Sequence, residues 1–226
     1  MRVQKRNGEY EIVSFDKILK RIQLLCIGQE FEKKLVIDPT LIAQKVCSEI
    51  YENVKTTQLD ELSSQIAVSM YSKNPEYGTL AGRIVVSNHH KRTNAKFSQV
   101  IEELYKNDIL QEYLYDLVRE NSDLIDEKIN DMKDYELDFF GFKTLEKSYL
   151  LKINEKIVER PQYLFMRVAL CIHRDNLEKA FETYDHLSNK DLIHATPTLF
   201  NAGTKREQLA SCFLLAMKED SVSGIY

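Results

Sequence analysis

The dipeptide Asn7-Gly8 lies between two short runs of β-prone residues, within residues 2–13 of the chain. Asn-Gly in such a setting is the strongest short-range signal for a β-hairpin, because both residues accept the left-handed backbone angles of a tight turn. The sequence therefore predicts a β-hairpin at the start of the chain.

Two registers of this hairpin fit the sequence. A two-residue turn pairs Arg6 with Glu9, whereas a three-residue loop with a left-handed Gly8 pairs Lys5 with Glu11. Side chains alternate along a strand, so the second register places two apolar and two charged side chains on one face: Val3, Lys5, Glu11 and Val13. We favour this register, because its face has apolar members to bury and a charged pair at its centre.

Apolar residues then recur at helical spacing, which predicts four short helices. The residues expected to mark their starts are Ser14, Asp38-Pro39, Thr56 or Thr57, and Pro75. The first helix is expected over residues 16–26 and the fourth over residues 75–96. Together with the hairpin, these helices make a small domain in which two short strands rest on a helical bundle.

The pattern changes after Phe97. Helices are expected over residues 110–121, 124–132, 162–173 and 176–188, the third of them opened by Pro161. Residues 138–143 are aromatic and contain glycine, and residues 148–153 are expected to be extended or a strand. Residues 195–204 are expected to form a loop that leads into an apolar strand over residues 208–217.

Composition narrows the class of protein. The chain has 226 residues, of which 43% are hydrophobic and 29% charged, and its formal net charge is −4 with scattered Lys and Arg. This argues against a protein that binds a nucleic-acid backbone. No apolar run is long enough for a transmembrane helix, and no signal peptide is seen, so we expect a cytoplasmic protein.

The four cysteines are Cys26, Cys47, Cys171 and Cys212. None of them forms a C-x-x-C pair, so we expect no metal site in this chain. From their spacing alone, all four are readily explained as small buried hydrophobic residues.

Several segments, in order along nearly the whole chain, resemble the large subunit of class I ribonucleotide reductases. Those that resemble the N-terminal ATP-cone of that family are Lys5-Arg6-Asn7-Gly8, Phe15-Asp16 and residues 81–88. Those that resemble the beginning of its catalytic domain are residues 140–146, Glu159-Arg160-Pro161-Gln162, residues 196–204 and Ser211-Cys212-Phe213-Leu214.

The resemblance implies a fold that is mainly α with small β elements. Residues 1–93 would be the ATP-cone, a β-hairpin on a short helical bundle. Residues 94–226 would be the helical part and the first strand of an incomplete ten-stranded α/β barrel. On this reading we expect the subunit to continue beyond Tyr226.

The resemblance also implies an allosteric activity site for ATP or dATP in the cone. Its residues would be Lys5, Arg6, Glu11, Ile12, Val13, Ser14, Phe15, Asp16, Thr56, Asp60 and Lys91. Cations and a helix start suit a triphosphate, and Glu11 can accept a hydrogen bond from a base or a ribose. The residues alone leave simpler explanations open: Lys5 and Glu11 as a cross-strand pair, Thr56 and Asp60 as favourable residues at a helix start.

In the catalytic part, Cys212 would be one cysteine of the redox pair that reduces the ribose. The resemblance places Thr196 and Ser211 at the bound ribonucleoside diphosphate, and Asp220, Ser221 and Val222 at the start of the allosteric specificity site. Without the resemblance, the simplest interpretation is that Cys212 is a core cysteine, Thr196-Pro197 a turn and Asp220-Ser221 a loop.

The family's enzymes reduce ribonucleoside diphosphates by thiyl-radical chemistry. Their partners would be a small subunit that carries the radical and its metal cofactor, thioredoxin or glutaredoxin, and further copies of the large subunit. The other active-site cysteines would lie beyond Tyr226, so we expect this chain alone to bind ATP or dATP without catalysis. The competing interpretation is a stand-alone nucleotide sensor or a decoy built on an ATP-cone.

Overall fold

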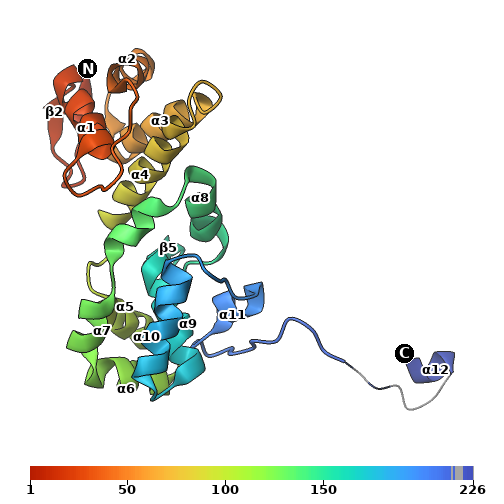
Figure 1. The fold of residues 1–226 in the computed structure, drawn as a ribbon. Helices are drawn as coiled ribbons and strands as arrows, with labels where there is room; N and C mark the ends of the chain where they lie inside the picture. The colour runs from red at the N-terminus through yellow and green to blue at the C-terminus, as the bar shows by residue number, and fades with distance from the viewer. Residues whose placement is uncertain (215, 217–220, 226) are drawn as a thin grey trace.

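The computed structural model of the chain describes residues 1–214, 216 and 221–225. Two lobes follow one another along the molecule, the first built from the N-terminal strands and helices and the second from residues after 96 (Figure 1). Helix α4 (Glu76–His90) belongs to the first lobe and runs toward the second (Figure 1). The mainly helical fold with small β elements that the sequence predicts is confirmed.

The first lobe contains a three-stranded sheet in the order β2-β1-β3. Strands β1 (Arg2–Gln4) and β2 (Tyr10–Ile12) are antiparallel, and β3 (Val54–Lys55) pairs with β1 in parallel. The sequence did not predict β3, because a strand of two residues carries no alternation that could reveal it.

The hairpin has the three-residue loop and the left-handed Gly8 that we expected, with φ +89°. The expected register is wrong, because the partner of Glu11 is Val3 and not Lys5. The backbone N–H of Lys5 donates to the Glu9 carbonyl at 2.8 Å, which closes the loop around residues 6–8. Val3, Lys5 and Glu11 still share one face, and the charged pair forms diagonally, Lys5 Nζ to Glu11 Oε2 at 2.7 Å.

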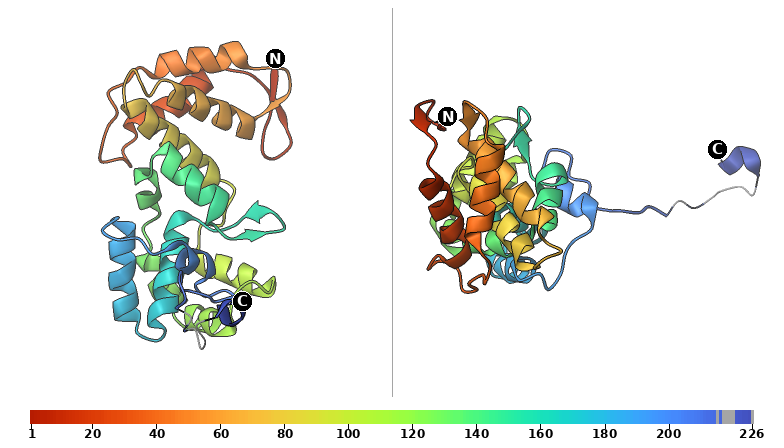
Figure 2. Two further views of the ribbon diagram at one scale, coloured as in Figure 1. Left: turned by 90° about the vertical axis from the view of Figure 1, so that its right-hand side faces the viewer. Right: turned by 90° about the horizontal axis from the view of Figure 1, so that it is seen from above.

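Helices α1 (Phe15–Ile27), α2 (Pro39–Glu49), α3 (Thr56–Ser69) and α4 make up the rest of this lobe, with the sheet at one side (Figure 2). Their buried faces form one apolar core that includes Ile22, Leu25, Ile42, Val46, Leu80 and Ile84. Asp38 caps α2 as predicted, with its carboxylate accepting from the Thr40 N–H at 2.8 Å.

Two helix boundaries in this lobe differ from those expected. Lys55 precedes α3, so Thr56 is its first helical residue, and the Gln58 side chain accepts from the Lys55 N–H at 3.0 Å. Helix α4 ends at His90, short of the expected residue 96.

The second lobe is a helical bundle with one small hairpin. Its elements are α5 (Phe97–Lys106), α6 (Glu112–Glu120), α7 (Ser122–Lys128), η1 (Asp131–Glu136), α8 (Phe139–Ser148), β4 (Lys152–Ile153), β5 (Lys156–Ile157), α9 (Pro161–His173), α10 (Leu177–Ser188) and α11 (Thr196–Asn201). Pro161 opens α9, as the sequence indicates, and Asn176, expected as the first residue of the next helix, caps α10. Helices α5 and α8 were not predicted, and α11 replaces an expected loop.

The middle and the end of α4 join the two lobes. A Cβ added to Gly82 would lie 2.5 Å from the Leu137 carbonyl oxygen, so only glycine lets α4 approach this backbone so closely. His90 Nε2 lies 2.7 Å from Asp134 Oδ2, and His89 Nε2 donates to the Glu159 carbonyl at 2.9 Å. These contacts connect the first lobe to both η1 and the residues before α9.

The strand expected over residues 208–217 is wrong for the residues that can be compared. Residues 208–214 and 216 adopt no strand, and no described segment forms a ladder beside them. Residues 215 and 217 of that expectation lie outside the described part. A strand needs a partner for its N–H and C=O groups, and an apolar run supplies none by itself. A short helix, α12 (Val222–Ile225), follows.

Candidate nucleotide-binding site

A cavity of about 340 Å³ opens in the first lobe between the β1–β2 hairpin and helices α1, α3 and α4. Its wall contains apolar side chains from all four elements: Val3, Ile18, Ile22, Leu59 and Ile84. Cavities of this size with a few converging polar groups are typical of small-molecule sites.

Asp60 is the charged centre of this cavity. It is only 8% exposed, on the first turns of α3. Arg6 Nη2 donates to its Oδ2 at 3.1 Å, and Arg21 Nε donates to its Oδ1 at 3.0 Å. One carboxylate therefore holds two guanidinium groups, one from the hairpin and one from α1, at the mouth of the same cavity.

Both arginines are also tied to α4. Arg6 Nη2 donates to Asn88 Oδ1 at 2.6 Å, and Arg21 Nη2 donates to Ser87 Oγ at 3.1 Å. Because side chains of α4 take part in fixing both guanidinium groups, this arrangement brings the end of the helix and the cavity into one hydrogen-bonded network.

Lys91 follows α4 and faces the cavity, with its Nζ 3.9 Å from Asp60 Oδ2. Burial lowers the pKa of Lys91 to about 8, against the opposing effect of Asp60, and the charges of Arg21 and Arg6 lower it further. Burial destabilises the protonated form of Lys91. A bound anion stabilises this form, because it supplies the compensating charge.

A second acidic group, Glu11 on β2, lies at the other side of the cavity. It is paired with Lys5 at 2.7 Å and also with Lys17 of α1. The cavity thus offers carboxylate acceptors at two places and five cationic side chains, Lys5, Arg6, Lys17, Arg21 and Lys91. Such a combination suits a ligand with a polyphosphate and hydroxyl or amino donors.

The residues expected to bind substrate, Thr196 and Ser211, do not line this cavity. Thr196 is the first residue of α11, and its hydroxyl lies 3.1 Å from the Tyr149 hydroxyl. Thr198 Oγ1 donates to the Leu209 carbonyl at 3.2 Å, which attaches the segment before Cys212 to α11. Cys212 itself is exposed and does not line this cavity.

Known proteins match both lobes. The ATP cone domain family matches residues 1–92, and the ribonucleotide reductase all-alpha domain family matches residues 135–207. The whole chain is 49% identical to a protein named ribonucleoside-diphosphate reductase large subunit from Dictyostelium discoideum, and 45% identical to its namesake from Arabidopsis thaliana. A relative of the same name from Vaccinia virus is 48% identical.

The chain belongs to the ribonucleotide reductase large-subunit family. It covers 27%, 28% and 30% of these three relatives, so it spans less than a third of their length. The resemblance stated from the sequence is therefore confirmed, including the ATP-cone. The boundary expected between residues 93 and 94 stays a prediction.

The fold brings most of the expected activity-site residues to one cavity. Those that line it are Lys5, Arg6, Glu11, Ile12, Val13, Ser14, Thr56, Asp60 and Lys91. Phe15 and Asp16 begin α1 beside the cavity and are not part of its lining. That these residues bind ATP or dATP stays a prediction.

Sequence reasoning missed Arg21, the second guanidinium on Asp60. The signal for it is weak but present, because Arg21 lies at helical spacing from Lys17 and Ile18 and so shares their face of α1. Ser87 and Asn88 were also missed as the groups that hold the arginines from α4.

Of the residues expected in the specificity site, Ser221 and Val222 are exposed and Asp220 lies outside the described residues. Ser211 is exposed as well. The described residues contain no cluster of three or more His, Cys, Asp or Glu side chains arranged for a metal ion. Within the same residues, no helix is long and apolar enough to cross a membrane.

Proposed function

We propose that the cavity of the first lobe binds ATP and dATP as allosteric effectors. The cations Lys5, Arg6 and Lys91 contact the phosphates, and the Thr56 hydroxyl and the free N–H groups at the start of α3 add donors. The adenine and ribose lie against the apolar wall, within reach of the carboxylates of Glu11 and Asp60.

The observation that carries this proposal is the environment of Asp60. A buried carboxylate with two guanidinium groups at 3.0 and 3.1 Å and an ammonium at 3.9 Å leaves a local excess of positive charge beside an open cavity. One carboxylate balances one positive charge, so the three cations around Asp60 leave a net positive charge. An anionic ligand balances this remaining charge.

We further propose that the chain serves as the N-terminal region of a reductase large subunit. The overall reaction replaces the C2′–OH of a ribonucleoside diphosphate with C2′–H and releases water, while two cysteine thiols become a disulfide. In this proposal Cys212 is one of those thiols, Thr196 and Ser211 contact the substrate, and Asp220, Ser221 and Val222 begin the specificity site. A radical-bearing small subunit, thioredoxin or glutaredoxin, and further large subunits complete the enzyme.

Nucleotide binding is tested by thermal unfolding with ATP and with dATP. A ligand at 100 times its dissociation constant stabilises the native state by about 2.7 kcal/mol, which raises the melting temperature by a measurable amount. Asp60→Asn should remove the shift. The matched control is Glu61→Gln, a neighbouring acid on α3 that does not line the cavity, and it should keep the shift.

The outcomes separate this function from the alternatives. A chain that shows no shift with either nucleotide contradicts the proposal and favours a cone without a ligand.

Catalysis is tested by adding a small subunit, thioredoxin and a ribonucleoside diphosphate to the isolated 226-residue chain. We expect no deoxyribonucleotide, and any turnover would refute the assignment of the remaining active-site groups to other parts of the subunit.

A further inference from the structure

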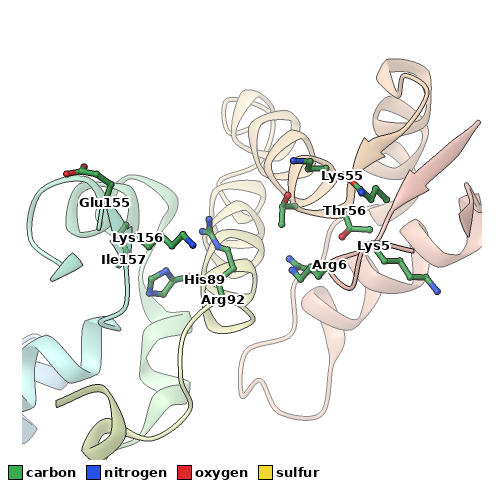
Figure 3. Close-up of a pocket in the computed structure, with 12 residues that line it drawn as sticks. Lys5, Arg6, Lys55, Thr56, His89, Arg92, Glu155, Lys156 and Ile157 are labelled. Carbon is green, nitrogen blue, oxygen red and sulfur yellow. The ribbon is translucent and has the colours of Figure 1, made fainter. Parts of the chain in front are cut away.

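A second and larger cavity, of about 710 Å³, lies between the two lobes. It is bordered by the loop of the β1–β2 hairpin, the start of α3, the end of α4 and the β4–β5 hairpin (Figure 3). Both hairpins project from the same side of the molecule, one above the other (Figure 2). We call this cavity the interlobe cleft.

The interlobe cleft is strongly basic. Five cationic side chains line it, namely Lys5, Arg6, Lys55, Arg92 and Lys156, against a single carboxylate, Glu155. Figure 3 shows Lys156 extended toward the first lobe and the carboxylate of Glu155 turned away from the gap.

Two of these cations have no counter-ion among the residues that the structure describes. Lys5, Arg6 and Arg92 each pair with one acid that does not line the cleft: Glu11 at 2.7 Å, Asp60 at 3.1 Å and Glu146 at 3.2 Å, respectively. Lys55 and Lys156 make no ion pair with any residue that the structure describes. One comes from each lobe, so the unbalanced charge faces the cleft from both sides.

The β4–β5 hairpin fixes the position of Lys156. Ile153 pairs with Lys156 across a two-residue turn, in which Asn154 and Glu155 have φ values of 47° and 64°. Two positive φ angles define the tight turn that matches the twist of paired strands, so the turn sets the register of β5. Lys156 is thereby held on the side of the cleft, and Lys152 of β4 is not among its lining residues.

Hydrogen-bond donors complete the lining. The hydroxyls of Thr56 and Thr57 lie at the start of α3, where the first backbone N–H groups of a helix have no partner within it. His89 contributes a buried ring whose Nε2–H is already donated to the Glu159 carbonyl at 2.9 Å. The threonine hydroxyls and the N–H groups at the helix start suit an anion with several oxygen acceptors, whereas the N–H of His89 is already used.

We propose that the interlobe cleft binds an oligophosphate group, with Lys55 and Lys156 as its unpaired cations. A bound phosphate chain would contact the first lobe and the β4–β5 hairpin together and so stabilise their arrangement. Because Lys156 lies outside the matched ATP-cone, this extends phosphate binding beyond the cone itself.

Two sources of the phosphate chain are consistent with the lining. The cleft shares Lys5, Arg6 and Thr56 with the nucleotide cavity, so the tail of a nucleotide bound there could enter it. A separate phosphate compound could also fill it. Only the first source rests on the proposed function.

The test uses titration calorimetry of the whole chain with two probes, ATP and inorganic tripolyphosphate. The variants are Lys156→Gln, Lys55→Gln and the matched control Lys152→Gln, which makes the same charge change in the same hairpin. We expect Lys156→Gln to weaken the binding of at least one probe about tenfold or more, since it removes a charge-assisted contact. Lys152→Gln should leave both affinities within about twofold.

The pattern of affinity changes identifies which compound supplies the phosphate chain. If the nucleotide tail enters the cleft, Lys156→Gln weakens ATP, and saturating ATP blocks tripolyphosphate. If a separate compound binds, Lys156→Gln weakens tripolyphosphate alone, and tripolyphosphate still binds when ATP is saturating. Asp60→Asn tests the nucleotide cavity independently in the same assay.

The inference is overturned if Lys156→Gln and Lys55→Gln both behave like Lys152→Gln with both probes, or if neither probe binds. In the first case, ATP binding that is lost in Asp60→Asn would still support the proposed function. Circular dichroism melting of each variant verifies that it is folded, as expected for exposed positions on a hairpin and at a helix start.

Discussion

Arg6 Nη2 lies 3.1 Å from Asp60 Oδ2, although 54 residues separate the two in the chain. The same nitrogen donates to Asn88 Oδ1 at 2.6 Å. One guanidinium therefore connects the hairpin to α3, which carries the acidic centre of the nucleotide cavity, and to the end of α4, which contacts the second lobe. A ligand that contacts Arg6 acts on a group that already joins three elements.

Replacing Arg6 with glutamine should weaken ATP binding about tenfold or more. The change removes a positive charge from the phosphate side of the cavity, and hydrogen bonds to charged groups are worth about 1.5–3 kcal/mol. Asp60 keeps its bond to Arg21, so we expect the fold to remain. Calorimetric titration measures the effect.

The control for this variant is Arg2→Gln on strand β1 of the same hairpin, since Arg2 lines neither cavity. Its affinity for ATP should match that of the unaltered chain. Equal affinities in both variants would show that Arg6 has no part in binding.

ATP affinity should fall as the pH rises from 7 to 9. In the empty site the pKa of Lys91 is lowered to about 8, so the side chain is largely protonated at pH 7 and largely neutral at pH 9. A phosphate favours the protonated form, so binding takes up a proton near pH 8 and weakens as that proton becomes harder to gain. Titrations in buffers of different ionisation enthalpy measure this uptake.

Lys91→Met should bind ATP more weakly at pH 7 and show a much flatter pH profile between 7 and 9. A profile as steep as that of the unaltered chain would assign the titration to another group. The charged groups that act on Lys91, namely Asp60, Arg21 and Arg6, remain in the variant. The difference between the two pH profiles therefore reports on Lys91 itself.

Local signals predicted the elements that depend on local chemistry. The pair Asp38-Pro39 marks the start of α2, and Pro161 marks the start of α9, because a cap and a proline act on the residues next to them. The hairpin register failed because the three-residue loop over residues 6–8 closes between Lys5 and Glu9, which places Glu11 opposite Val3. Thr196-Pro197 resembled a turn, but proline is equally accepted in the first turn of α11.

The nucleotide cavity was predictable in outline through the family resemblance, and its details were not. Lys5, Glu11, Thr56 and Asp60 were named from the sequence, and all four line the cavity. Arg21 reaches Asp60 only because α1 and α3 both pack on α4, which is a consequence of tertiary packing. The same limitation applies to the interlobe cleft, whose lysines come from segments about a hundred residues apart.

Gly8→Ala should destabilise the chain by about 1–2 kcal/mol. Gly8 has φ +89°, where a side chain is strained, and an added Cβ would meet nothing within 4 Å. The loss therefore measures backbone strain without a steric clash. Urea unfolding gives the free energy, and Gly8→Asn should cost less, since asparagine tolerates positive φ. Equal stability of the alanine variant would mean that the loop relaxes to another turn.

Glu159→Ala should cost about 3–5 kcal/mol, because it leaves a buried arginine without its counter-ion. Glu159 and Arg167 are paired at 2.6 Å with side chains only 1% and 0% exposed. Arg167 also donates to the carbonyls of Ala202 and Leu199 around the end of α11, at 2.6 and 3.2 Å. Unfolding by urea measures the loss.

The exposed pair Lys106 and Glu102 provides the comparison for this variant. Glu102→Ala should change stability by less than about 1 kcal/mol, because surface ion pairs contribute little. Similar losses in the two variants would contradict the role assigned to burial.

The four cysteines should differ sharply in their reaction with a disulfide reagent at pH 8. Burial raises the pKa of Cys26 to about 11, and burial together with its hydrogen bond to Glu207 raises that of Cys171. The thiolate is the reactive form, so these two thiols should react only when the chain unfolds. Cys212 is exposed and should react first, whereas half-buried Cys47 should follow slowly because burial raises its pKa too. Cys212→Ser should abolish the fast phase, and a fast phase that survives this change would place another thiol at the surface.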